Sequence, residues 1–171
     1  MDRSVEGGGD DPSGRATDSH LELPSDPDVG TRRPVHLRAS SLAWVFVGGV
    51  VGTAMRYLVE NLLPHDPSGW PWATFLVNLG GAFILGALLE GLARLGDDSG
   101  WRQRARLCAG TGGCGAFTTY STFALEVVSL DRHGQIATAI GYGVLSVVGG
   151  VVAAWLGIVV AASVHRSKAR A

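Results

Sequence analysis

An apolar stretch from Leu107 to Leu130 carries in its middle a segment rich in glycine and hydroxyl residues, GTGGCGAFTTYSTF (110–123). A helix that crosses lipid must satisfy its backbone groups internally, so this composition predicts a broken helix buried against other protein. The backbone carbonyls and amides freed at a break can hold an ion. The alternative is that the glycines only allow close packing and the hydroxyls only bond back to their own helix.

The apolar residues, 46% of the chain, are concentrated in long blocks, which points to the membrane. We therefore expect an all-α membrane protein with four transmembrane helices, the third of them broken. The first residues are rich in Gly, Asp, Ser and Pro and predict a disordered tail. The expected organisation is a polar tail at 1–39, a membrane domain at 40–164 with helices at about 40–63, 72–95, 107–130 and 136–164, and a basic cytoplasmic tail at 165–171.

Several function classes are disfavoured by composition. The net charge of −1 gives no sign of a nucleic-acid partner. An enzyme is not expected, because there is no nucleophile with a placed base, no metal-ligand cluster and no P-loop, the single lysine being Lys168 in the tail. Cys108 and Cys114 have no His or acidic neighbours at metal-ligand spacing, so both are interpreted as small packing residues.

Polar side chains at membrane depth are the candidate functional residues. Asn78 shares a helix face with Thr74, and it either makes an interhelical hydrogen bond or lines a path as a donor. Tyr142 and Ser146 form a hydroxyl stripe that either lines a path or joins helices. Arg56 either snorkels to lipid headgroups or lines an aqueous vestibule that attracts anions.

The distribution of basic residues predicts the orientation of the chain. Loop one has no Lys or Arg, and loop three has only Arg132. Both termini and loop two are basic, and the positive-inside rule places them in the cytoplasm. We therefore expect a multi-pass protein of the cell membrane with both termini inside. The basic residues on the cytoplasmic side are Arg32, Arg33, Arg38, Arg94, Arg102, Arg104, Arg106, His165, Arg166, Lys168 and Arg170.

Three ordered motifs carry a family resemblance. The third segment, GTGGCGAFTTYSTFALE (110–126), resembles the third-helix motif of the CrcB family, the Fluc-type fluoride channels. GGVVGTAMRY (48–57) is similar to the first-helix motif of that family, and ATFLVNLGGAFILG (73–86) to the second. The resemblance covers about residues 41–160. Two positions depart from the family pattern: Ala116 replaces a glycine and Tyr120 replaces a phenylalanine.

The resemblance implies a fluoride-specific channel that exports fluoride passively from the cytoplasm. Fluoride is small and strongly hydrated, so its path must supply hydrogen-bond donors in place of water. By position, a structural sodium ion that is not transported would be held by the main-chain carbonyls of Gly115 and Thr118. Arg56 and Glu126 would stand at the vestibule, with an interfacial carboxylate as the alternative for Glu126. The residues expected along the fluoride path are Asn78, Tyr120, Ser121, Thr122, Phe123, Tyr142 and Ser146.

The family architecture is a dual-topology dimer of two antiparallel subunits embedded in lipid. An antiparallel homodimer needs one sequence to insert both ways, whereas this chain has a strong bias toward one orientation. The hypothesis that follows is a heterodimer with a paralogous subunit of opposite bias. Two alternatives remain: a small four-helix antiparallel cation or drug exporter, in which a first-helix carboxylate is expected but Glu60 sits only at the helix end, and a non-transporting membrane subunit.

Overall fold

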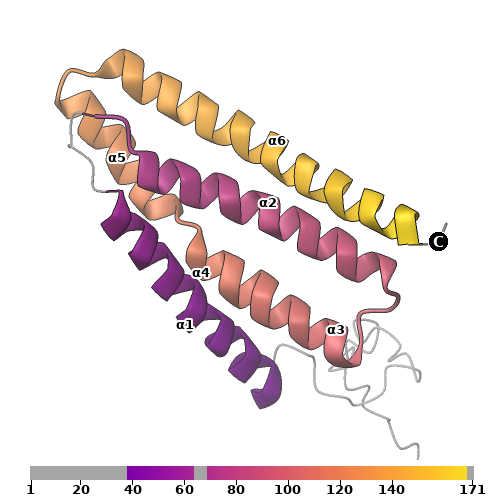
Figure 1. Cartoon of the computed structure of the whole chain (residues 1–171). Coiled ribbons are helices and arrows are strands. Elements are labelled where there is room, and N and C mark those ends of the chain that lie inside the picture. The colour runs from indigo at the N-terminus through magenta and orange to yellow at the C-terminus, as the bar shows by residue number, and fades with distance from the viewer. Residues whose placement is uncertain (1–37, 64–68, 169–171) are drawn as a thin grey trace, which may run out of the picture. The chain divides into compact units, whose positions relative to one another are not determined.

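The computed structural model describes residues 38–63 and 69–168. The predicted tail at 1–39 lies almost entirely outside these residues. Within the described part of the chain every regular element is helical, so the expectation of an all-α fold is confirmed. The helices from residue 38 onward belong to one compact unit (Figure 1).

Three helices are long and apolar enough to cross a membrane: α1 (Ala39–Leu62), α2 (Trp72–Arg94) and α6 (Ile136–Lys168). Their apolar side chains are largely exposed in the single chain; Phe46 is 72% exposed and Val151 is 67% exposed. In water so large an apolar surface would be costly. The chain is therefore a membrane protein whose outer surface requires lipid or a partner.

The third apolar segment is divided, as the sequence predicted. Its first half is continuous and runs through α3 (Gly100–Ala105), the π-helix η2 (Arg106–Cys114) and the single turn α4 (Gly115–Phe117). Thr118 and Thr119 then adopt extended backbone angles, and α5 (Tyr120–Arg132) begins directly after them. The helix break therefore consists of two residues, Thr118 and Thr119.

The first half begins at Gly100 rather than near Leu107, where the apolar stretch starts. Arginine side chains organise the polar turns in between. Arg102 donates from Nε to the carbonyl of Asp97 and from Nη1 to the carbonyl of Leu95, and Arg106 pairs with Asp98. Hydropathy indicates only the apolar part of the helix, which starts at Leu107. The polar turns from Gly100 onward are helical as well, and the arginine bonds stabilise them.

The first half of the broken helix lies between α1 and α2 (Figure 1). Helix α2 lies between α6 and η2, and η2 in turn packs on α1. A Cβ atom at Gly48 would overlap the carbonyl oxygen of Cys108, and one at Gly112 would overlap that of Val45. The backbones of α1 and η2 thus approach as closely as two helices can, which is the use of small-residue spacing in membranes.

The contact between α2 and α6 follows the same rule. A Cβ at Gly86 would overlap the carbonyl oxygen of Ala154, and one at Gly157 would overlap that of Phe83. Close backbone approach therefore joins α1 to η2 and α2 to α6.

Candidate functional site

The break is stabilised by the side chain of Asn78, which lies on α2. Its Nδ2 donates to the carbonyl of Thr119 at 3.0 Å, and its Oδ1 accepts from the Thr119 N–H at 2.8 Å. Thr119 is 6% exposed, so these backbone groups have little access to water. The Asn78 amide therefore replaces the backbone partners that Thr119 would have in a continuous helix.

Thr119 also starts the second half of the broken helix. Its Oγ1 accepts from the N–H of Thr122, the arrangement of an N-cap, and it donates to the Thr122 hydroxyl at 3.0 Å. The Ser121 hydroxyl lies 3.3 Å from the same oxygen. The hydroxyls of Ser121 and Thr122, expected along the path, are thus engaged in capping α5.

The same bonds take the helical N–H partners away from the main-chain carbonyls of Gly115 and Thr118. In a continuous helix the Thr119 N–H would bond to Gly115 and the Thr122 N–H to Thr118. Here the first N–H is directed to Asn78 and the second to the Thr119 side chain. The Thr118 hydroxyl and N–H both donate to the carbonyl of Cys114. The carbonyl oxygens of Gly115 and Thr118 are therefore available as ligands for a hard cation.

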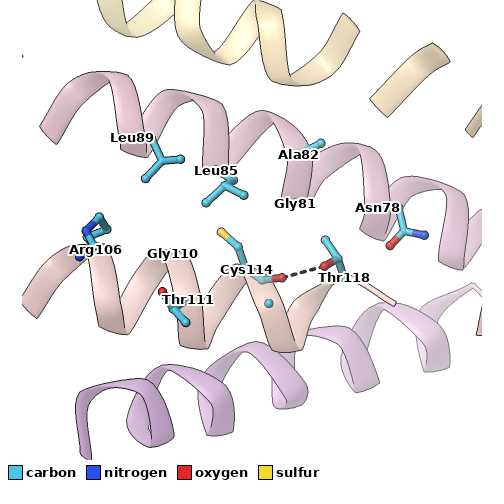
Figure 2. Close-up of a pocket in the computed structure, with 11 residues that line it drawn as sticks. Asn78, Gly81, Ala82, Leu85, Leu89, Arg106, Gly110, Thr111, Cys114 and Thr118 are labelled. Carbon is cyan, nitrogen blue, oxygen red and sulfur yellow. Dashed lines mark hydrogen bonds between the residues drawn. The ribbon is translucent and has the colours of Figure 1, made fainter. Parts of the chain in front are cut away.

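Two cavities meet at the break. The larger, of about 590 Å³, lies between α2 and the η2–α4 helix, as Figure 2 shows. It extends from Arg106 at one end to Asn78 and Thr118 at the other, with the Cys114 thiol on its wall. We call it the α2–η2 cavity. Cys114 is a buried packing residue, and it also lines this cavity.

The second cavity has a volume of about 290 Å³ and shares Asn78 and Thr118 with the first. We call it the Phe123 cavity; its other lining residues are Thr119, Tyr120, Phe123, Ser146 and Val147. Aromatic rings form much of its wall: the Tyr120 and Phe123 centroids are 6.1 Å apart, and Tyr120 is 81% exposed in the single chain. The Ser146 Oγ is buried and has no hydrogen-bond partner. The unpaired hydroxyl of Ser146 therefore belongs to a residue that lines the cavity together with two aromatic rings.

Beyond Phe123 lies a buried cluster that joins three helices. Glu126 on α5 is 8% exposed, and its two carboxylate oxygens accept from the hydroxyls of Thr74 and Tyr142, each at 2.7 Å. Tyr142 has no exposed surface, and its ring centroid is 5.2 Å from that of Phe123. We call Thr74, Glu126 and Tyr142 the carboxylate cluster. It continues the line of polar groups that starts at the break.

Several expected site residues line neither of the two cavities. Glu126 is buried between α2, α5 and α6, and its carboxylate is bonded to Thr74 and Tyr142. Tyr142 does not line either cavity and commits its hydroxyl to Glu126. Arg56 is half-buried on α1 and also lines neither cavity. The expected residues that do line a cavity are Asn78, Gly115, Thr118, Tyr120, Phe123 and Ser146.

Sequence reasoning missed two contributors. The N-cap role of Thr119 is not among the predictions, although a threonine directly before a helix is a typical N-cap signal. Thr74 was placed on the face of Asn78 but given no role, because its acceptor, Glu126, lies 52 residues away. Among the described residues no group of three or more His, Cys, Asp or Glu side chains is placed to hold a metal ion.

Comparison with known proteins adds a family to this geometry. The family model described as CrcB-like protein, Camphor Resistance (CrcB), matches residues 43–158, well over half of the chain. This match includes α2, the helix break and most of α6.

The similar curated proteins share one printed name. The chain is 42% identical over 125 residues to "Fluoride-specific ion channel FluC 1" of Cutibacterium acnes, covering 73% of this chain and 84% of that protein. It is 42% identical over 131 residues to "Fluoride-specific ion channel FluC 2" of Leifsonia xyli, covering 77% and 90%. The FluC 2 channel of Moorella thermoacetica is 40% identical over 126 residues, covering 71% and 98%.

Proposed function

Because this chain belongs to the CrcB family, we propose that it is a fluoride-specific ion channel, which lets fluoride leave the cytoplasm down its electrochemical gradient. Relatives at about 40% identity over most of their length carry that name. An ion channel performs no covalent chemistry. The supporting structural observation is the position of the two cavities, which meet at the break with a free hydroxyl and aromatic edges on the far side.

Passage of fluoride requires donors that replace its hydration shell. The Asn78 amide has two hydrogens on Nδ2, and only one of them is bonded to Thr119. Because Asn78 lines both cavities, we assign the second hydrogen as the first donor that fluoride meets between them. In the Phe123 cavity the donors are the Ser146 hydroxyl and the positive edges of the Phe123 and Tyr120 rings. The path then continues toward Tyr142 and Glu126.

We further propose that sodium binds at the break as a structural ion. The carbonyls of Gly115 and Thr118 have lost their helical N–H partners, and Gly115 is exposed in the single chain. Neutral carbonyl oxygens suit a hard monovalent cation. The ion's positive charge would fix the two ends of the break; it is not transported. Two carbonyls are too few for a closed site, so the remaining ligands would come from a second subunit.

The working assembly is proposed to be an antiparallel dimer in the membrane. Large apolar areas of α1 and α6 and the exposed ring of Tyr120 support a partner at this surface. The one-sided distribution of basic residues favours a heterodimer with a paralogous CrcB subunit that inserts the other way. Both termini of this chain are then cytoplasmic.

Growth of a fluoride-sensitive bacterium tests the function. A strain without its own fluoride exporter should grow in fluoride when it expresses this chain, with a paralogous subunit where one is needed. The benefit should increase at low external pH, because neutral hydrogen fluoride enters and ionises inside. Phe123→Ile should abolish the rescue by removing a ring edge from the path. The matched control is Phe46→Ile on the outer face of α1, where Phe46 is 72% exposed. Equal rescue by both variants would contradict the assigned path.

A further inference from the structure

Two buried side-chain polar atoms in the described part of the chain have no hydrogen-bond partner, Ser146 Oγ and Trp70 Nε1. A buried donor without a partner costs free energy, so each such group calls for an explanation. Ser146 lines the Phe123 cavity, and the proposed path explains its hydroxyl. The indole N–H of Trp70 has no such explanation.

Trp70 is not a lipid-headgroup anchor. Tryptophans near the end of a membrane helix normally direct the indole N–H to the interface. Trp72 fits that description, since it is 54% exposed. The Trp70 Nε1 atom, in contrast, has essentially no accessible surface. Its ring packs edge-on against Phe75 and Tyr142, with centroid distances of 5.6 and 5.5 Å.

This packing places Trp70 next to the carboxylate cluster. Tyr142 contacts Phe123 and Trp70, and its hydroxyl donates to Glu126. Trp70 packs against the apolar cluster of Leu130, Ala139 and Tyr142, which lies where α5 ends and α6 begins. The order of contacts is therefore the Phe123 cavity, then Tyr142 with Glu126, then Trp70 at the end of the bundle.

An anion at this end of the path would have few donors available. The hydroxyl hydrogens of Thr74 and Tyr142 are both directed to Glu126, and a carboxylate in its ionised form can only accept. The indole N–H differs from the carboxylate, because it can donate a hydrogen bond to an anion and cannot accept one. Trp70 is thus the one group of this aromatic cluster whose donor is both buried and uncommitted.

We propose that the indole N–H of Trp70 donates a hydrogen bond to the anion as it passes the carboxylate cluster, which makes Trp70 a further anion-binding residue of the channel. This inference rests on the proposed fluoride path. It assigns to Trp70 a contact with the permeating ion, whereas Trp72, two residues away, only anchors the helix in lipid.

Replacement of the indole nitrogen tests the role without changing the shape. Incorporation of β-(benzothiophen-3-yl)alanine at Trp70, by stop-codon suppression, keeps the bicyclic ring and removes the N–H. Fluoride efflux from liposomes that contain the conducting assembly should fall about tenfold or more, as expected for the loss of one hydrogen bond to a charged group. The same replacement at Trp72 should leave efflux within about twofold of the unmodified rate, since exposed sites tolerate change. Equal efflux from both replacements would overturn the proposal.

A binding measurement covers the case in which the replacement prevents folding. The ¹⁵N–¹H signal of the Trp70 indole, assigned by comparison with Trp70→Phe, should shift in a saturable way as fluoride is added to the unmodified protein in micelles. Chloride should produce no saturable shift. An indole signal that fluoride leaves unchanged would overturn the proposal, whatever the efflux. Absent efflux from the unmodified protein with a saturable fluoride shift would instead remove the proposed function and keep the site.

Discussion

At the scale of single residues, Asn78 has a structural duty that precedes any contact with an ion. Its amide pairs with both backbone groups of buried Thr119. Asn78→Ala should destabilise the protein by about 1–3 kcal/mol for each of the two groups left unpaired. The readout is the unfolding free energy in mixed micelles titrated with denaturing detergent.

Asn61→Ala is the matched control for that measurement. Asn61 makes one exposed bond to the carbonyl of Tyr57, four residues earlier in the same helix. Its removal should change the unfolding free energy by no more than about 0.5 kcal/mol. Equal losses from the two alanine variants would mean that the Asn78 amide does not support the break, and the fluoride-donor role would then be its main one.

At the scale of helices, glycines allow α1 and η2 to pack backbone against backbone. Gly48→Ala should prevent the approach of α1 to η2, because the added Cβ would overlap the carbonyl oxygen of Cys108. We expect a large drop in the yield of folded protein, read from the monodisperse peak in gel filtration. Gly49→Ala, with no atom within 4 Å of the added Cβ, should fold like the parent chain. A folded, monodisperse Gly48→Ala variant would contradict the close contact.

Much of this arrangement follows from sequence patterns, and the exceptions have physical reasons. The break was predictable because glycines and hydroxyls interrupt an apolar stretch, and hydropathy located α1, α2 and α6. The start of the third helix at Gly100 was not predictable from hydropathy, since arginine bonds to the loop define it. The burial of Glu126 depends on Thr74 and Tyr142, which come from other helices. Hydrogen bonds between residues far apart in the sequence produce no local sequence pattern.

At the scale of the whole molecule, we propose that the single chain is one subunit of the channel. Large apolar side chains remain exposed on α1 and α6, and lipid or a partner would cover them. The carbonyls of Gly115 and Thr118 have lost their helical N–H partners. The proposed sodium site would take its remaining ligands from a second subunit. The bias of the basic residues toward one side favours a partner that is a different chain with opposite orientation.

Fluoride efflux from liposomes is the most direct test of the account. Vesicles should contain this chain alone, or this chain with a paralogous CrcB subunit, and release should be followed with a fluoride electrode against a chloride control, with and without sodium. We expect fast release of fluoride but not chloride from the paired preparation, release that depends on sodium, and little from the chain alone. Fluoride release from the chain alone would contradict the heterodimer. Absence of selective fluoride release from both preparations would contradict the channel itself.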